Sequence, residues 1–476
     1  MHPKAILASI ALLQAPLLIS ASCNFADVKL STNPGFTISV NGDYKILEDT
    51  SAKVKYGLFC DAKPSNVDGV DKWFKVPVSS VGTRIPIASG FLEALSLRNN
   101  LTAVAENLTL TNPCLNTGNM AILNSTSDNS TNVDVIFSSN ATSDGEKSVR
   151  LPSDDSLSPL QLAEWIKFVA AFFNVEINAS KLFDSISTAY SCLNGNMQNV
   201  KQRPHAYWVQ YTNTTNGGHA YNIIESAYQK SLLASASATN NTNKLPDDSA
   251  DQGKFQDAVK DAQFVIDQTD LKRMGMRVKE WQEDFGYTDA PNSGVPFLTS
   301  MNIWRTDGYN SKNGVSNFPE FGLVRPDLVL RDLISILEPT YDSTYNRTWM
   351  WRLGSGSEST TNIGASNYDC SNPWITTVTK CSPRSDFYGG EFSTDGSDSS
   401  GNDQNEEGKS SDKSKSKSSS KGGKIAGGVV AAVVLIGLGF VGLHYYNRNR
   451  RQARMRALSQ TEHGEDIGLQ STNRFR

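Results

Sequence analysis

Apolar positions between residues 317 and 339 repeat with the period of an α-helix. They fall at i, i+3, i+4 and i+7 and are Leu330, Leu333, Ile334 and Leu337. Such a stripe is typical of a helix that packs one face on a core. Pro326 suits the first helical position, where its missing N–H costs nothing, and Pro339 ends the pattern. We therefore predict an amphipathic helix that begins near Pro326 and ends before Pro339.

A longer helical pattern lies in the middle of the chain. Ser158 and Gln161 have the spacing of a capping box, and apolar residues then recur at helical intervals. The pattern predicts a helix from Pro159 to Leu193, roughly 50 Å long at 1.5 Å per residue if it is unbroken. Asn174 and Asn178 are the positions at which it would break.

Shorter apolar runs on both sides of this helix alternate between strand and helix patterns. Strands are predicted at 76–87 (running into a loop), 133–137, 205–211, 264–267 and 301–304. Helices are predicted at 89–97, 221–236, 255–262 and 271–284. This alternation indicates an α/β fold with mostly parallel strands.

The two ends of the chain indicate passage through a secretory membrane. Residues 1–22 read as a signal peptide, with Lys4 followed by a short apolar core. Residues 425–446 contain a long uncharged run, typical of a transmembrane helix, and an arginine-rich tail follows at 447–476. We expect a single-pass type I membrane protein of the cell surface or a secretory-pathway membrane, with a cytoplasmic tail that could bind a partner.

Two further segments precede the predicted span. Residues 393–424 are rich in Ser and Lys and lack core residues, which favours a disordered stalk. Residues 353–392 form an extension that contains cysteines. All six cysteines precede the span, and an even number in an oxidising compartment indicates up to three disulfides. We predict a pair between Cys370 and Cys381, because the loop between them is short.

Asn-x-Ser/Thr triplets, the acceptor sites for N-glycosylation, also occur only before the span. They are Asn100, Asn107, Asn124, Asn129, Asn140, Asn178, Asn213, Asn240 and Asn346. Their density predicts a glycosylated luminal or extracellular domain.

Composition and missing motifs narrow the classes of function. The net charge of −4 and the absence of a basic domain argue against a nucleic-acid partner. No nucleophile elbow, zinc-protease, phosphate-loop or dinucleotide motif occurs in its required context, so we predict no enzyme and no cofactor. Only His205 and His219 lie between the signal and the span, which disfavours a site for a bare metal ion.

Two motifs in order resemble a known family. The first is Ala163–Phe168 with Phe172–Asn174, and the second is the loop from Gly314 through Asn317–Gly322 that leads into the helix ending at Glu338–Pro339. Both motifs resemble the sequences found at these places in bacterial ABC-importer substrate-binding proteins of the iron-siderophore and cobalamin type. The resemblance implies two Rossmann-like lobes, 23–157 and 196–352, joined by a long helix at 158–195.

The resemblance also implies a ligand held between the lobes. It would be a bulky small molecule such as a ferric siderophore, haem or cobalamin. Open α/β sheets place their sites at the carboxyl ends of strands, and the candidate residues near those ends are Arg84, Trp208, Tyr211, His219, Trp304, Arg305 and Tyr309. For each aromatic residue a role in the core is an open alternative.

A second hypothesis belongs to another class of protein. The chain has its own span and stalk, whereas bacterial members of the family are soluble or lipid-anchored. The glycosylated domain, stalk, span and short tail also fit a surface sensor or an adhesion glycoprotein that uses the fold as a scaffold without binding a ligand.

Overall fold

The computed structural model describes residues 25–115, 117–123, 132–140, 145–152, 156–213, 218–240, 250–269, 277–288, 294–364, 366–371, 373–377 and 379–390. All of them belong to one unit, Met1–Asp398. The predicted signal peptide, stalk, span and tail lie outside the described residues, as do Asn124 and Asn129. Among the helices in these ranges, none has the length and apolarity needed to cross a membrane.

An N-terminal sheet that the sequence reading missed opens the fold. Its strands, in order across the sheet, are β1 (Phe36–Asn41), β2 (Tyr44–Asp49), β3 (Val54–Phe59) and β4 (Lys72–Lys75). Only β3 and β4 run parallel. Burial alternates along β2 with the period of two expected for a half-buried strand. Phe36 and Tyr56 pack edge-on against Phe168 of the helix behind the sheet.

The first parallel sheet follows, in the order β7-β6-β5-β8-β9. Its strands are β5 (Val81–Thr83), β6 (Leu101–Ala105), β7 (Ala121–Leu123), β8 (Val135–Ser138) and β9 (Ser148–Arg150). Helix α1 (Pro86–Ala94) begins three residues before the predicted 89–97. The strand expected from residue 76 begins only at Val81; Pro77 has no N–H to donate to a strand ladder.

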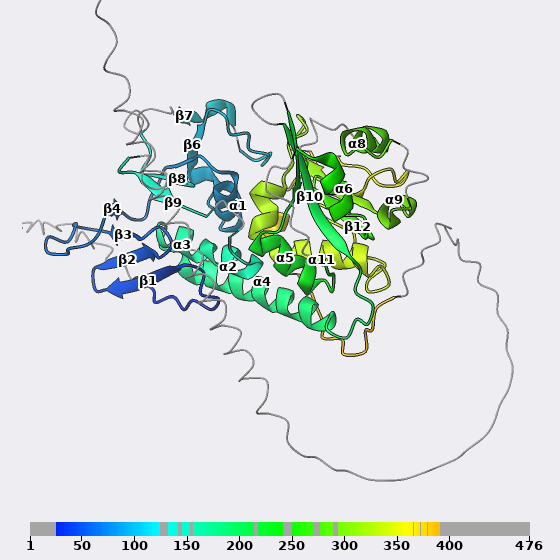
Figure 1. Cartoon of the computed structure of the whole chain (residues 1–476). Helices are drawn as coiled ribbons and strands as arrows, with labels where there is room; N and C mark the ends of the chain where they lie inside the picture. Colours follow the sequence, from blue (N-terminus) through cyan, green and yellow to red (C-terminus); the bar gives the residue numbers. More distant parts are fainter. Residues whose placement is uncertain are drawn as a thin grey trace, which may run out of the picture. The chain divides into compact units, whose positions relative to one another are not determined.

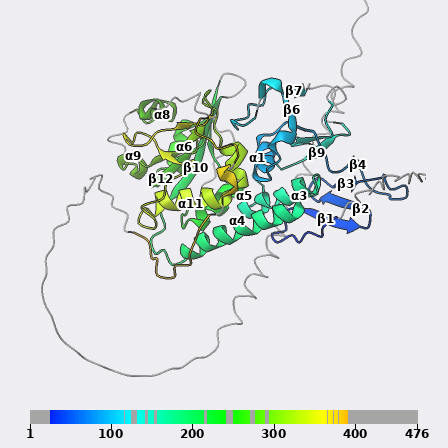
Figure 2. The ribbon, with the colours of Figure 1, turned by 180° about the vertical axis from the view of Figure 1, so that it is seen from behind.

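Three helices connect the first parallel sheet to the second. They are α2 (Pro159–Ala163), α3 (Trp165–Ala171) and α4 (Glu176–Asn196), and Figures 1 and 2 show α4 extending from α3 past α5 and α11. The predicted long helix at 158–195 is therefore interrupted, and one interruption is at Asn174, a position that the sequence analysis named. Asn174 has a φ of +55°, a left-handed conformation that ends a helix and that asparagine tolerates better than most residues. The capping box is confirmed, because the Ser158 N–H donates to Gln161 Oε1 at 3.0 Å.

The second sheet has the order β11-β10-β12-β13-β15. Its strands are β10 (Ala206–Asn213), β11 (His219–Ile223), β12 (Phe264–Asp267), β13 (Ile303–Arg305) and β15 (Trp351–Arg352). The central pairs are parallel and the two edge pairs antiparallel. A helix was predicted from residue 221, but Tyr221 lies in β11 opposite Tyr211. The α/β class with parallel strands is confirmed.

Helices and short strands complete the second half. The helices are α5 (Ala227–Ser235), α6 (Gln252–Ala258), α8 (Val278–Asp284), α9 (Pro296–Thr299), α10 (Phe318–Phe321) and α11 (Pro326–Leu337). Three-residue helical turns lie at Gly322–Val324 and Trp374–Thr376, and β14 (Tyr309–Asn310) pairs with β16 (Thr361–Asn362). Helix α11 begins and ends as its sequence pattern predicts.

Disulfides tie the extension back to the rest of the unit. Cys114 bonds to Cys370 with a Cα–Cα distance of 5.7 Å, and Cys192 bonds to Cys381 at 6.1 Å. The predicted pair between Cys370 and Cys381 is therefore wrong. A short loop in sequence does not decide pairing, because the partners are set by which Cα atoms the fold brings within bonding reach.

Candidate functional site

The predicted ligand residues do not converge on one surface. Trp208 is fully buried and its Nε1 donates to Gln268 Oε1 at 2.7 Å. Tyr211 lies in a different core cluster from Trp208, so the two side chains occupy opposite faces of β10. His219 is exposed, and its ring stacks on Tyr211 with centroids 5.2 Å apart. Trp304 is buried in the core, where Arg347 covers its ring.

Arg305 is committed to an ion-pair network inside the second sheet. Its side chain is 1% exposed, with Nη1 2.6 Å from Asp267 Oδ2 and Nη2 2.7 Å from Asp307 Oδ2. The same carboxylates accept hydrogen bonds from Trp281 Nε1 and Trp351 Nε1. Burial raises the pKa of Asp267, although the Arg305 charge opposes that rise. This guanidinium joins β13 to β12 and to Asp307 in the loop after β13, and Asp307 in turn accepts from Trp351 of β15.

Arg84 and Tyr309 are the two remaining candidates. Arg84 follows β5 and is half-buried, and its backbone N–H donates to Phe137 O at 2.9 Å. Tyr309 is half-buried in β14 and lines a pocket described below. The structure therefore places the seven candidates in the core, at an exposed strand end and beside a pocket, without joining them in one site.

A buried polar junction joins the first half of the chain to the second, where α1 meets α10. Glu320 of α10 is 1% exposed, and its Oε1 accepts a hydrogen bond from Ser89 Oγ at 2.6 Å. Its Oε2 accepts from the Thr111 N–H at 2.6 Å and from the Thr111 hydroxyl. Burial raises the pKa of Glu320, and these donors offset part of the rise. A carboxylate from the second half is thus satisfied by donors from the first.

Glycine allows the two helices to touch at this junction. A Cβ built on Gly90 of α1 would lie 1.9 Å from the backbone oxygen of Glu320, well inside any real contact. The side chain of Asn317 adds a cross-link, since its Nδ2 donates to Thr111 Oγ1 at 2.8 Å. The junction is therefore closed by backbone contact and by side chains of the chain itself.

A second buried carboxylate lies close by on α1. Glu93 accepts from Arg98 Nη1 at 2.7 Å, from Asn112 Nδ2 at 2.8 Å and from Tyr368 Oη at 3.2 Å. Arg98 also donates to the backbone oxygen of Cys370. Burial and the nearby Glu93 charge raise the pKa of Tyr368, so its hydroxyl stays protonated and donates. Glu93 therefore binds the extension to the first half of the chain, beside the Cys114–Cys370 disulfide.

The pocket has a volume of about 460 Å³ and lies between α11 and the extension. Its lining residues are Tyr309, Leu328, Arg331, Thr348, Thr377, Thr379 and Lys380. Tyr309 is the one sequence-predicted ligand residue among them. Across the described ranges, no group of three or more His, Cys, Asp and Glu side chains is arranged to hold a metal ion.

Sequence reasoning missed Glu93 and Glu320, although a signal was present. Each is a lone carboxylate among apolar and small residues, Glu93 in the predicted helix and Glu320 in the loop of the second motif. A carboxylate in such a setting is almost never buried unless it is paired or hydrogen-bonded.

Comparison with known proteins gives similarities only among solved structures. No family model matches the chain, and no curated protein matches it significantly. The periplasmic heme-binding protein RhuT from Roseiflexus sp. RS-1 is similar at 13% identity and a TM-score of 0.40, over 54% of this chain and 97% of that chain. A periplasmic heme-binding protein from Pseudomonas aeruginosa is similar at 10% identity and a TM-score of 0.43. This similarity covers 60% of this chain and 100% of that chain.

Helicobacter pylori CeuE with Ni(II) bound is similar at 10% identity and a TM-score of 0.40, over 60% of this chain and 92% of that chain. Similarities of this size assign neither a family nor a ligand to the chain. Its function is therefore argued from its own contacts.

Proposed function

We propose that the chain is a membrane-anchored, extracytoplasmic glycoprotein whose α/β unit serves as a rigid ectodomain of a sensor or adhesion protein. The unit presents a fixed surface and does not close around a ligand between two lobes. One observation carries this proposal: Glu320 of α10, in the second half of the chain, is buried against Ser89 and Thr111 of the first half, so the two halves are in direct contact.

The energetics of this junction support a rigid unit. A hydrogen bond to a charged group contributes about 1.5–3 kcal/mol, and leaving a buried charge without partners costs more. Opening the junction would separate Glu320 from its hydrogen-bond donors. It would also break the close contact between Gly90 and the backbone of Glu320. The disulfide between Cys114 and Cys370 opposes the same motion covalently.

The glycosylation sites support the same reading. Asn107 and Asn140 are exposed and follow β6 and β8, at the carboxyl end of the first parallel sheet. Open α/β sheets bind small ligands at that end. Glycans at these two positions would obstruct a small ligand and suit a surface that meets macromolecules.

Capture of a bulky iron chelate remains the second candidate. The order of elements favours it, because three helices separate a parallel sheet from a second, largely parallel sheet. The sequence resemblance implies the same order of two lobes with a helical connection between them. The two candidates differ in a measurable property, since capture requires a site that a ligand can enter and saturate.

Thermal unfolding of the purified full-length protein in detergent separates the candidates. Hemin, a ferric siderophore and cobalamin are each titrated, with the iron-free siderophore as the matched control. We expect no saturable increase in Tm with any of them. A saturable increase, before or after enzymatic removal of N-linked glycans, would refute the rigid ectodomain and support capture.

A further inference from the structure

We propose that the pocket between α11 and the extension binds a small organic anion carrying a carboxylate or a phosphate. This goes beyond the proposed function, because a rigid ectodomain needs no small ligand. The volume of about 460 Å³ lies within the range of about 300–1,000 Å³ found for ligand sites. The pocket depends on Thr377, Thr379 and Lys380, which lie beyond the segment that carries the family resemblance.

The charges at the pocket favour an anion. Arg331 and Lys380 line it, and no carboxylate is among the described lining residues. Arg331 is partly neutralised, because its Nη2 lies 2.8 Å from Asp342 Oδ2. Lys380 is exposed, and in the described ranges no carboxylate forms an ion pair with it. Lys380 is therefore the charge that a ligand would neutralise.

Two buried carboxylates bond to lining residues, and neither is paired with Lys380 in the described ranges. Asp327 accepts from Thr379 and pairs with Arg325 Nη2 at 2.8 Å. Asp332 accepts hydrogen bonds from Tyr345 Oη at 2.7 Å and from the backbone N–H groups of Thr348, Trp349 and Met350 at 2.7 to 3.1 Å. Its oxygens are thus occupied by protein donors. Burial also raises the pKa of Asp332, which disfavours its charged form.

The remaining lining sets the size and polarity of the ligand. Thr348 and Thr377 contribute hydroxyl groups, while Tyr309 and Leu328 contribute apolar surface. The guanidinium of Arg331 is held in place over the Tyr345 ring at 4.2 Å. A compact anion with hydroxyl or short apolar groups, such as a hydroxycarboxylate, matches this combination of cations, hydroxyls and apolar surface.

The wall formed by the extension is fixed before any ligand arrives. Cys381, next to Lys380, is bonded to Cys192 of α4. The Arg325 guanidinium donates to the backbone oxygen of Ile375 and to Thr379 Oγ1, the latter at 3.1 Å. A wall held at Ile375, Thr379 and Cys381 lowers the entropy that ligand binding must offset.

Calorimetric titration of the full-length protein in detergent tests the site, with citrate and inorganic phosphate as probes and glycerol as the neutral control. Ionic strength is kept constant, because surface charge effects are screened by salt. We expect saturable binding of at least one anion and none of glycerol. Lys380→Gln should weaken binding about tenfold, the loss expected for one charge-assisted contact.

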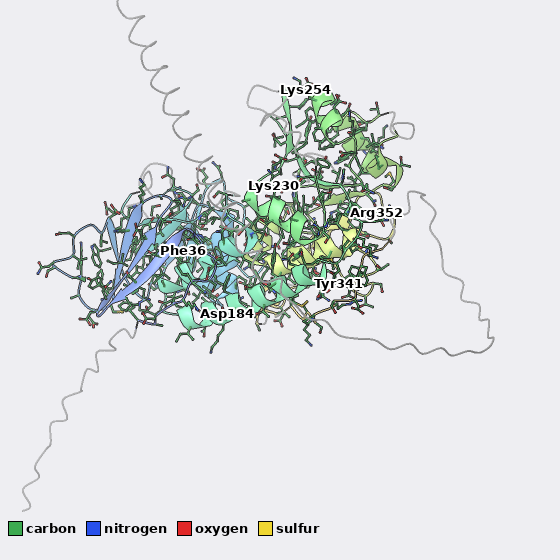
Figure 3. All side chains as sticks on the ribbon, turned by 60° about the horizontal axis from the view of Figure 1, so that its bottom comes forward. Phe36, Asp184, Lys230, Lys254, Tyr341 and Arg352 are labelled. Atoms are coloured by element: carbon green, nitrogen blue, oxygen red, sulfur yellow. A yellow bond between two sulfur atoms is a disulfide. The ribbon has the colours of Figure 1, made fainter. Side chains whose placement is uncertain are left out.

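Lys254→Gln is the matched control, since it removes the same charge from α6, where Figure 3 labels Lys254. It should leave the affinity unchanged. The proposal is overturned if neither anion gives saturable heat, if Lys380→Gln binds as the wild type does, or if Lys254→Gln weakens binding equally. Binding of citrate alone or phosphate alone supports the site and identifies the anionic group.

Discussion

Glu320 shows how one buried residue can join distant parts of a chain. Its carboxylate has little access to water and depends on Ser89 and Thr111, which lie more than two hundred positions earlier in the chain. Because burial raises its pKa above the ordinary value of 4.5, the folded state holds the proton at a higher pH than the unfolded state does.

This shift gives a pH dependence with a defined sign. From pH 4.5 up to the raised pKa of Glu320, the folded state binds more protons than the unfolded state, so the free energy of unfolding falls as pH rises. Glu320→Gln removes this titration. The stability of the wild type relative to Glu320→Gln should therefore decrease from pH 5 to pH 8, as measured by urea unfolding. A relative stability that increases over this range would contradict the assignment.

The type of a residue alone does not show whether a predicted ligand-binding residue lies in a binding site or in the core, and Arg305 is an example. Arg305 follows a strand and precedes Asp307 and Gly308, a sequence that equally suits a ligand-binding loop and an internal ion pair. Asp267, its second partner, lies 38 positions earlier. Only the parallel pairing of β12 with β13 brings the two side chains together. The sequence reading of Arg305 as a ligand residue therefore lacked the information that fixes its partner.

At the level of elements, close contact between α1 and α10 holds the junction. Gly90→Ala should improve helix propensity by up to about 1 kcal/mol but should cost more than that, because its Cβ would meet the Glu320 backbone oxygen at 1.9 Å. We expect a net loss of stability and faster amide hydrogen exchange in α1 and α10.

Gly195→Ala is the control for this change. Gly195 lies in α4, and a Cβ there meets nothing within 4 Å. The substitution should stabilise the protein by about 0.5–1 kcal/mol through helix propensity alone. Equal effects of the two substitutions would show that α1 and α10 do not touch.

For the whole unit, the disulfides act as restraints on the extension. The Cys114–Cys370 bond closes a segment of 256 residues, and the Cys192–Cys381 bond closes one of 189. Removing a native disulfide commonly costs about 2–5 kcal/mol. The first bond crosses to the first half of the chain, and the second joins the extension to α4.

These positions predict different consequences of removing each bond. Cys114→Ala/Cys370→Ala should increase hydrogen exchange at Thr111 and in α10, because the junction loses its covalent restraint. Cys192→Ala/Cys381→Ala should leave those amides protected and increase exchange at residues 379–390. Identical exchange patterns in the two variants would contradict separate roles for the bonds.

Local pattern determined most of the secondary structure. Helix α11, strand β12 and the capping box at Ser158 match their predictions because each depends on residues within one or two turns. The N-terminal sheet was missed because its strands carry many polar residues, so their alternation is only partly apolar. The break at Asn174 could be named as a position but not decided, since an asparagine also fits inside a helix.

By itself, the sequence determined an α/β fold with parallel strands, the bounds of α11 and β12, and the number of cysteines before the predicted span. The tertiary structure decided which cysteines pair, where the predicted ligand residues lie and that Glu320 fills the junction. The physical reason is the separation along the chain between the residues that interact. Helix and strand periods arise from neighbours along the chain, whereas burial, ion pairs and disulfides depend on atoms that only folding brings together.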